Sequence, residues 1–489
     1  MLRDTYRDLL RHSSVYAVGQ LLGRLASLVL LPIYTRYLSP ADYASIAILD
    51  VTTGVLAVLI GSGFSAALTR YHFDDDREDY RRGLWWTGVA FVTATATAIL
   101  VPAWFLRNML ADLLLGPEVQ YRTLYLEIAL PQLWTGTIGQ IPETHLRTRK
   151  HSTVYVVLNL GRLLLNVALN LVFLIRLGMG VTGILLGNLI TSIVYTGVQI
   201  VLFSITVGTP RLNRSLVAPL WEYGRPLIAT ALLATFLHNG DRYILRLFVD
   251  MKAIGLYSVA YMAGQGINTM LIVPFTAIWN VAIYEIAAGT NPESVFAAVF
   301  HYFFRFLILA MFGASLMAVP LLGILAGPDY QPAADLVPIV CLAYVFFSLH
   351  EQFRVPVLLA KRTSLLLPVF AFATLLNIGS NLALIPFCGI AGAAWASVIT
   401  FAGFSLFGLS RYRTVARYPY RLQTCCLELF TMSICYLAFR LWRANFQADL
   451  IRQIFVAAFL WLSWALVLFR RPIETFVRGQ VAQRRAAVA

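Results

Sequence analysis

Five arginines lie inside long apolar stretches of this 489-residue sequence: Arg24, Arg162, Arg242, Arg305 and Arg354. A charged side chain costs about 2.5 to 3.5 kcal/mol at the centre of a membrane helix on insertion scales, so we expect each to face protein or water. The planar guanidinium offers paired donors and a permanent charge, which suit the phosphates of a lipid-linked sugar. We therefore predict that these residues bind the phosphate or glycan part of a substrate.

Three carboxylates in similar stretches, Asp50, Asp241 and Glu351, could bind Na⁺ or shuttle a proton and so couple transport to an ion gradient. Each could instead neutralise a nearby arginine. Glu351 and Arg354, three residues apart, have the spacing of such a helical pair. The five arginines also have an alternative to substrate binding: each could form a buried ion pair or extend its charged end toward the membrane interface.

Polar amides recur in the apolar segments, and the other reactive residue types form no site. The asparagines that could contact sugar hydroxyls, or hold helices together, are Asn166, Asn170, Asn377 and Asn381. The five cysteines show no paired spacing and predict neither a metal site nor disulfides. Because no motif resembles a catalytic nucleophile or a phosphate-binding loop, we expect no catalytic residue, no cofactor and no enzymatic activity.

Composition predicts the elements that carry these residues. The sequence is 59% hydrophobic and 13% charged with a mean hydropathy of +0.72, far more apolar than a soluble domain. Repeated apolar stretches long enough to cross a bilayer predict an all-α membrane protein of about 14 transmembrane helices. The predicted spans are 14–36, 42–68, 83–106, 122–142, 152–175, 180–206, 226–248, 254–283, 297–324, 336–360, 364–386, 390–410, 424–440 and 453–470.

The formal net charge of +14 follows the predicted membrane topology and gives no indication of a nucleic-acid partner. With a cytoplasmic N-terminus, 24 of the 38 lysines and arginines fall in cytoplasmic turns or tails, and nine fall on the other side. This asymmetry follows the positive-inside rule. It predicts an even number of spans with both termini in the cytoplasm.

An internal repeat predicts how the spans are grouped. Residues 164–191 align with residues 375–400, at an offset of 211 before a short gap, so that Gly180 meets Gly389. Weaker matches at the same offset predict two six-helix lobes in a pseudo-twofold parallel repeat. The expected domains are an N-terminal lobe (1–207), a cytoplasmic interfacial connector (208–225), a C-terminal lobe (226–412) and two added helices with a basic tail (413–489).

Several segments resemble the polysaccharide-transporter, or Wzx-type flippase, branch of the MATE and lipid-flippase superfamily. They are LPIYTRYLSPADYASIAILD (31–50), GSGFSAALTRYHFD (61–74), WEYGRPLIATALLATFLHNGDRYIL (221–245) and AIGLYSVAYMAGQGINTMLIVPFTAIWNVAIYE (253–285). The first loop departs from the family, because it has ADYAS where many members carry a glycine. The resemblance implies two six-helix lobes around a central cavity, alternating access and often two extra helices.

The expected function is translocation of a polyprenyl-(pyro)phosphate-linked oligosaccharide across a bacterial inner membrane for polysaccharide biosynthesis. The expected partners are this anionic lipid-linked glycan, membrane lipids and assembly proteins such as a polymerase. A lipid II flippase and an ion-coupled multidrug exporter remain alternatives, although five intraspan arginines suit a cationic drug poorly. A membrane glycosyltransferase is a further alternative, but it usually needs a larger outer loop or a metal-binding acidic motif.

Overall fold

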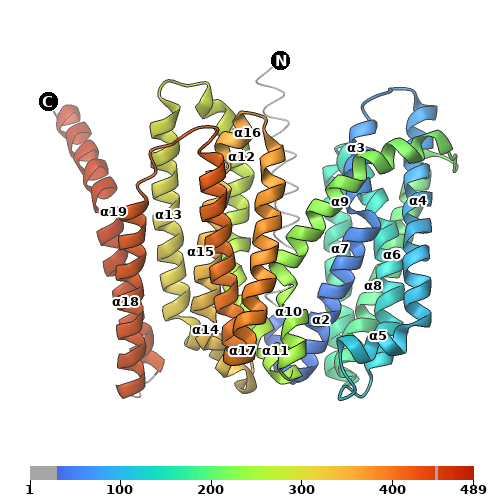
Figure 1. Cartoon of the computed structure of the whole chain (residues 1–489), viewed down its shortest axis with the longest axis horizontal. Helices are drawn as coiled ribbons and strands as arrows, with labels where there is room; N and C mark the ends of the chain where they lie inside the picture. Colours follow the sequence, from blue (N-terminus) through green and yellow to red (C-terminus); the bar gives the residue numbers. More distant parts are fainter. Residues whose placement is uncertain (1–29, 447–449, 489) are drawn as a thin grey trace. The chain divides into compact units, whose positions relative to one another are not determined.

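The computed structural model describes residues 30–446 and 450–488, with the backbone alone described for Ser62, Phe446 and residues 471–488. Every regular element within these ranges is a helix (Figure 1). The chain divides into two compact units. The first contains residues up to Ser258 with Leu325–Asp329 and Phe370–Ala393, and the second contains Val259–Ile324, Tyr330–Val369 and the chain from Ala394.

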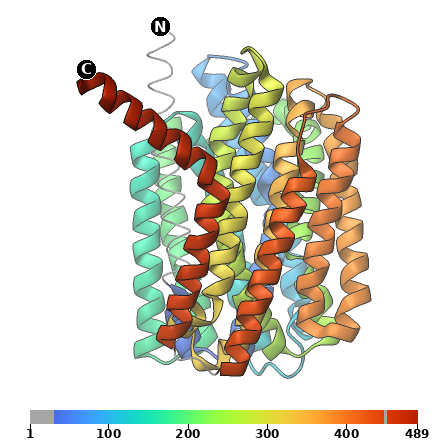
Figure 2. The same ribbon diagram turned by 90° about the vertical axis from the view of Figure 1, so that its left-hand side faces the viewer.

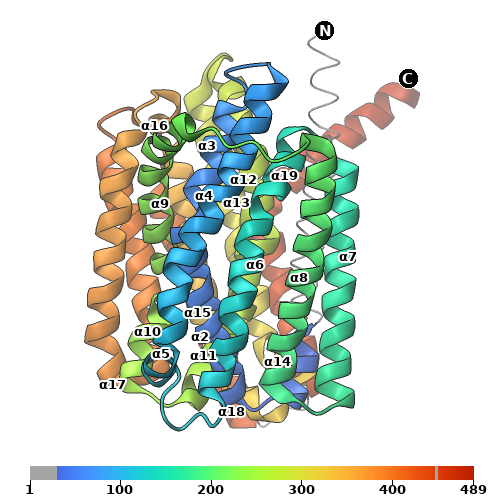
Figure 3. The ribbon, with the colours of Figure 1, turned by 90° about the vertical axis from the view of Figure 1, so that its right-hand side faces the viewer.

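The first unit is built from long helices that pack side by side. Figure 3 shows α4, α6, α7 and α8 together, and contacts join α6 with both α4 and α8. These four helices are α4 (Glu78–Phe105), α6 (Arg122–Thr148), α7 (Ser152–Leu171) and α8 (Gly180–Val207). The other elements before the unit boundary are α2 (Pro40–Ala57), η1 (Val58–Ser62), α3 (Gly63–Tyr71), α5 (Arg107–Leu114), η2 (Val172–Arg176), η3 (Arg214–Leu216), α9 (Val217–Asn239) and α10 (Asp241–Phe248).

The second unit has α13 (Pro292–Leu316) packed against α15 (Val337–Phe353), α18 (Leu422–Phe446) and α19 (Leu450–Val488). Figure 2 shows α18 and α19 in orange-red and dark red near the yellow α13. Its further elements are η4 (Asn268–Ile272), α12 (Val273–Ala287), α14 (Ala318–Leu325), η5 (Pro328–Asp335), α16 (Val355–Leu359) and η6 (Thr363–Leu365). Four elements contribute residues to both units: α11 (Met251–Ile267), α17 (Leu366–Tyr412) and, by one or two residues, α14 and η5.

The described residues contain nine helices that are long and apolar enough to cross a membrane, or up to ten if one pair bent by 48° is a single span. This confirms a multi-pass helical membrane protein. The number is lower than the predicted fourteen for several reasons. Helix α9, which covers most of the predicted span 226–248, is not among the nine, and the predicted spans 364–386 and 390–410 lie in the single helical stretch Thr363–Tyr412. The predicted span 336–360 belongs to the bent pair. Most of the predicted span 14–36 lies outside the described residues. Helix α6 has 27 residues but is not among the nine, because polar side chains lower its hydropathy.

Corresponding elements recur along the chain at nearly constant spacing. Helix α2 begins at residue 40 and α11 at residue 251, an offset of 211, and the π-helical turns η1 and η4 that follow them begin at 58 and 268, an offset of 210. Gly180 and Gly389, paired in the sequence alignment, both have positive φ, at 56° and 54°. Glycine tolerates this left-handed conformation, and Gly389 interrupts α17 as Gly180 opens α8.

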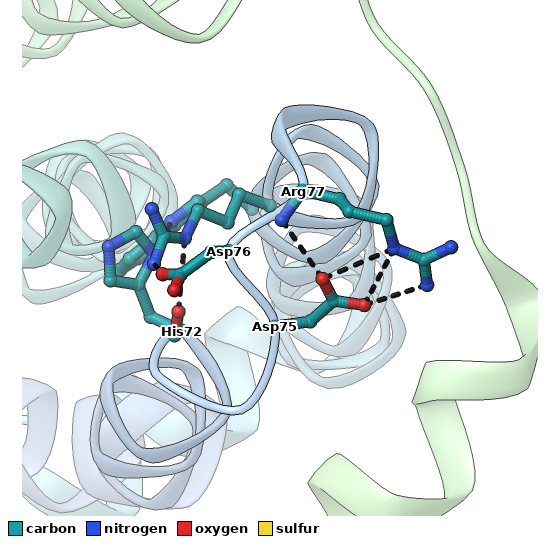
Figure 4. A network of polar contacts seen from close by, with 6 residues as sticks. His72, Asp75, Asp76 and Arg77 are labelled. Atoms are coloured by element: carbon teal, nitrogen blue, oxygen red, sulfur yellow. Dashed lines mark hydrogen bonds and ion pairs between the residues drawn. The ribbon is translucent and has the colours of Figure 1, made fainter.

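The loop between α3 and α4 is held by polar contacts (Figure 4). Asp75 accepts hydrogen bonds from the backbone N–H of Arg77 at 2.9 Å and from its guanidinium at 2.7 Å. Trp85 donates its indole N–H to Nδ1 of His72 at 3.1 Å, and Arg81 donates to the His72 carbonyl at 3.2 Å. Burial, followed by the charge of Arg81, lowers the pKa of His72 to about 4. This histidine is therefore neutral near pH 7.

Candidate functional site

A cavity of about 790 Å³ lies within the first unit and is lined by α2, α6, α7 and α8. Threonine, serine and tyrosine hydroxyls contribute to its wall. Its amide side chains are Gln132, Gln140, Asn159, Asn166, Asn188 and Gln199. Amides both donate and accept hydrogen bonds. The wall is thus chemically complementary to a ligand that carries many hydroxyl groups.

The polar residues reach the cavity because they repeat at helical spacing. On α6, Gln132, Gly136, Gly139 and Glu143 occur every three or four residues and therefore share one face. The glycines also let α8 approach closely, since a Cβ atom at Gly139 would lie 2.8 Å from Oε1 of Gln199. Helices α6 and α8 thereby pack closely, and each presents a stripe of polar residues to the cavity.

Three charged side chains line the cavity: Arg162, Glu143 and Asp50. The Arg162 guanidinium lies 5.0 Å from the centroid of the Tyr195 ring, which is a cation–π distance. Among the described residues, no carboxylate lies within 4.0 Å of that guanidinium. Asp50 is exposed. Arg162 is therefore available to an incoming anion, as its predicted role requires.

Several polar atoms in the cavity wall have no hydrogen-bond partner among the described residues. They are Oγ1 of Thr191, the hydroxyl of Tyr195 and both amide atoms of Gln199. These side chains are buried, with exposed fractions of 2%, 7% and 1%. Since buried polar groups are nearly always hydrogen-bonded, the wall has unused capacity for a polar ligand.

The predicted asparagines divide between the cavity and helix packing. Asn166 lines the cavity and donates to Oδ1 of Asn188 at 2.7 Å. Asn170 donates to the Tyr34 hydroxyl at 2.8 Å and so joins α7 to the segment before α2. Asn381 donates to the Asn377 carbonyl at 2.8 Å, within one helix. Asn166 is the one of the four that lines this cavity.

Arg242 and Asp241 form a buried ion pair at the start of α10, with 3.0 Å between Nη1 and Oδ1. Tyr257 of α11 donates its hydroxyl to the second oxygen of Asp241, and its ring centroid lies 5.7 Å from the Arg242 guanidinium. Tyr243 of α10 hydrogen-bonds Thr52 of α2 at 3.0 Å. The structure thus brings a predicted phosphate ligand and a predicted ion-coupling residue together as a neutralised pair.

In the second unit, Arg305 connects α13 to the two C-terminal helices. Its guanidinium lies 2.6 Å from the Glu428 carboxylate of α18 and donates to the Leu468 carbonyl of α19 at 3.4 Å. The side chain of Glu428 is 13% exposed. These contacts give Arg305 a clear structural task, and its binding of substrate stays a prediction.

Arg354 pairs with Glu351 at 2.7 Å, as their spacing predicted, and donates to Asn280 at 3.4 Å. Glu351 and Asn280 line a smaller cavity of about 390 Å³ within the second unit, together with Asn268 of η4.

Arg24, predicted to bind phosphate, lies outside the described residues. In the part of the chain that the structure describes, no three His, Cys, Asp or Glu side chains lie close enough together to hold a metal ion.

Sequence reasoning missed most of the cavity wall. It singled out Arg162, Asp50 and Asn166, but not Gln132, Gln140, Glu143, Asn159, Asn188 or Gln199. A scan for polar residues at helical spacing inside apolar segments would have found the stripes on α6 and α8. The sequence could not show that these stripes face each other.

The fold is similar to several solved transporters. The lipid II flippase MurJ in an inward closed conformation matches with a TM-score of 0.76 at 14% identity, covering 94% of this chain and 99% of that chain. An inward-facing multidrug resistance MATE family transporter of the MOP superfamily matches with a TM-score of 0.65 at 14% identity, covering 80% and 93%. A MOP superfamily transporter from Pyrococcus furiosus matches with a TM-score of 0.53 at 14% identity, covering 84% and 96%.

Because the sequence identity is only 14%, the similarity to the MurJ and MATE structures shows a shared fold and nothing further. A comparison with curated proteins finds no match. The sequence profile of a family described as "Polysaccharide biosynthesis protein" matches residues 9–279, which is more than half of the chain and includes all four helices that line the polar cavity. The chain therefore belongs to the polysaccharide biosynthesis protein family, as its motifs indicated.

Proposed function

We propose that this protein is a flippase that moves a polyprenyl-(pyro)phosphate-linked oligosaccharide from the inner to the outer leaflet for polysaccharide biosynthesis. The cargo would be a repeat unit of O-antigen, exopolysaccharide or capsule. The observation that carries the proposal is the amide-lined cavity of the first unit with the unpaired Arg162 in its wall. Membership of the family supports the same substrate class.

In this proposal Arg162 binds a phosphate oxygen and the surrounding amides bind the sugar. A guanidinium can donate two parallel hydrogen bonds to a phosphate. The amides can replace the water that a sugar loses when it leaves the aqueous phase, so the head group crosses without a large desolvation cost. Arg24, Arg242, Arg305 and Arg354 remain candidates for further contacts along the path.

Transport would be driven by a Na⁺ or proton gradient or by downstream consumption of the glycan. Asp50, Asp241 and Glu351 are the candidates for ion binding. The position of Asp50 in the cavity wall supports this role for it. A cation bound there would change the affinity of the cavity for the substrate, and the substrate would change the affinity for the cation. Asp241 and Glu351 each pair with an arginine, so an ion would have to compete with that arginine.

Alternating access would use two six-helix lobes, 1–207 and 226–412, joined by the connector 208–225 and followed by the added helices of 413–489. The recurrence of α2 and η1 as α11 and η4 at offsets of 211 and 210 supports the repeat. The positive φ of both Gly180 and Gly389 supports it independently. We place all 14 spans in the bacterial inner membrane, with both termini in the cytoplasm and a polymerase or other assembly protein as partner.

Reconstituted vesicles test this function against the drug-exporter alternative. Purified protein in proteoliposomes is offered a polyprenyl diphosphate-linked oligosaccharide and, separately, a lipophilic cationic dye. We expect the glycan to become accessible to an impermeant glycosidase on the opposite face, while the dye distribution matches that of protein-free vesicles. Dye movement without glycan movement would overturn the proposal in favour of an exporter.

A further inference from the structure

The side chains that line the polar cavity include more carboxylates than guanidinium groups. Two carboxylates, Glu143 and Asp50, line it together with one guanidinium, that of Arg162. Neither carboxylate forms an ion pair with any described residue within 4.0 Å. Arg242 acts electrostatically on Asp50 from outside the lining, but it is itself paired with Asp241. Once a phosphate has neutralised Arg162, the carboxylates of Glu143 and Asp50 are therefore the charged groups that remain among the lining residues.

The hydrogen-bonding groups of the wall are uncharged and well suited to sugar hydroxyl or acetamido groups. Gln199 is 1% exposed, lines the cavity, and has no partner for either amide atom among the described residues. Thr191 and Tyr195 line the same wall with unpartnered hydroxyls. These orphaned groups independently indicate that the cavity is built for a ligand with many neutral donors and acceptors.

We infer that the sugar residues entering this cavity are uncharged, and that the site selects against sugars bearing a carboxylate. The inference rests on the proposed flippase function and adds to it the chemical class of the glycan. The negative charge of the cargo then resides on its phosphates, next to Arg162. A uronic acid in the glycan would bring a further carboxylate into the cavity that Glu143 and Asp50 line, where like charges repel.

Matched substrates test this selectivity. Proteoliposomes receive one of two polyprenyl diphosphate-linked disaccharides that differ only in whether one sugar carries a hydroxymethyl group or the corresponding carboxylate. We expect the wild-type protein to translocate the uncharged substrate at least about tenfold faster. Glu143→Gln, which keeps size and hydrogen bonding but removes the charge, should reduce this preference by about tenfold.

A control variant separates the cavity from the general charge of the protein. Glu222 is an exposed carboxylate of α9 that does not line the cavity, so Glu222→Gln should leave the preference unchanged. If Glu143→Gln fails to fold, the wild-type preference alone decides the question. Equal or faster transport of the carboxylate-bearing substrate by the wild-type protein would overturn the inference and leave the flippase function standing. Transport of neither substrate would overturn both.

Discussion

The Arg242 guanidinium and the Asp241 carboxylate, neighbours in sequence, lie 3.0 Å apart and are buried. Removing one partner of a buried pair leaves an uncompensated charge and costs about 3–5 kcal/mol. We predict that Asp241→Asn lowers the unfolding temperature in detergent. The double variant Asp241→Asn with Arg242→Gln, which removes both charges, should recover part of that loss. An unfolding temperature of Asp241→Asn equal to wild type would contradict this role.

Gly63 and Gly224 bring α3 and α9 into backbone contact. A Cβ atom at Gly63 would lie 2.4 Å from the Gly224 carbonyl oxygen. We predict that Gly63→Ala separates these helices and destabilises the protein by about 1–3 kcal/mol, measured by denaturant unfolding in detergent. The matched control is Gly197→Ala on α8, where nothing lies within 4 Å, and where alanine should be neutral or stabilising. If Gly197→Ala destabilises the protein more than Gly63→Ala does, the close contact between Gly63 and Gly224 is refuted.

His72 should make the stability of the protein depend on pH. Burial and the charges of Arg81 and Arg149 lower its pKa in the folded protein to about 4, against an ordinary value of 6.5. Between these values the unfolded chain binds the additional proton, so the folded state loses stability as pH falls from 6.5 toward 4. His72→Asn, whose amide oxygen can still accept from Trp85, should weaken this dependence.

The check is the unfolding temperature at pH 7.5 and pH 5, compared between wild type and His72→Asn. A suitable control is His151→Asn, which changes an exposed histidine. If His72→Asn and wild type lose the same stability on acidification, the buried neutral histidine is not the cause.

Arg305 should act through Glu428 to attach the C-terminal helices. We predict that Glu428→Gln destabilises the contact of α18 with α13, because it leaves a largely buried guanidinium without its carboxylate. Limited proteolysis should then cut the variant near residues 413–421 faster than wild type. If Arg305 instead serves the substrate alone, Arg305→Gln will reduce transport per folded molecule while the cleavage rate stays that of wild type.

Local features of the sequence predicted the helical membrane class, the family and the pairing of Glu351 with Arg354, because hydropathy, motifs and a three-residue spacing need no tertiary structure. The pairing of Arg305 with Glu428 spans 123 residues and depends on helix packing. Four arginines of similar sequence context, those that the structure describes, also have different surroundings. Arg242 pairs with its neighbour in sequence, Asp241. Arg162 instead lines a polar cavity that the packing of α2, α6, α7 and α8 creates.

The central claim is that Arg162 and the polar cavity carry the head group, and the initial rate of lipid-linked glycan translocation in proteoliposomes tests it most directly. Arg162→Gln should reduce the rate by at least about tenfold, the loss expected for a charge-assisted hydrogen bond, and Arg162→Lys should recover only part of it. The control Arg176→Gln changes an exposed arginine at the end of η2, outside the cavity, and should transport like wild type. Arg162→Gln at the wild-type rate, at equal amounts of folded protein, would contradict the account.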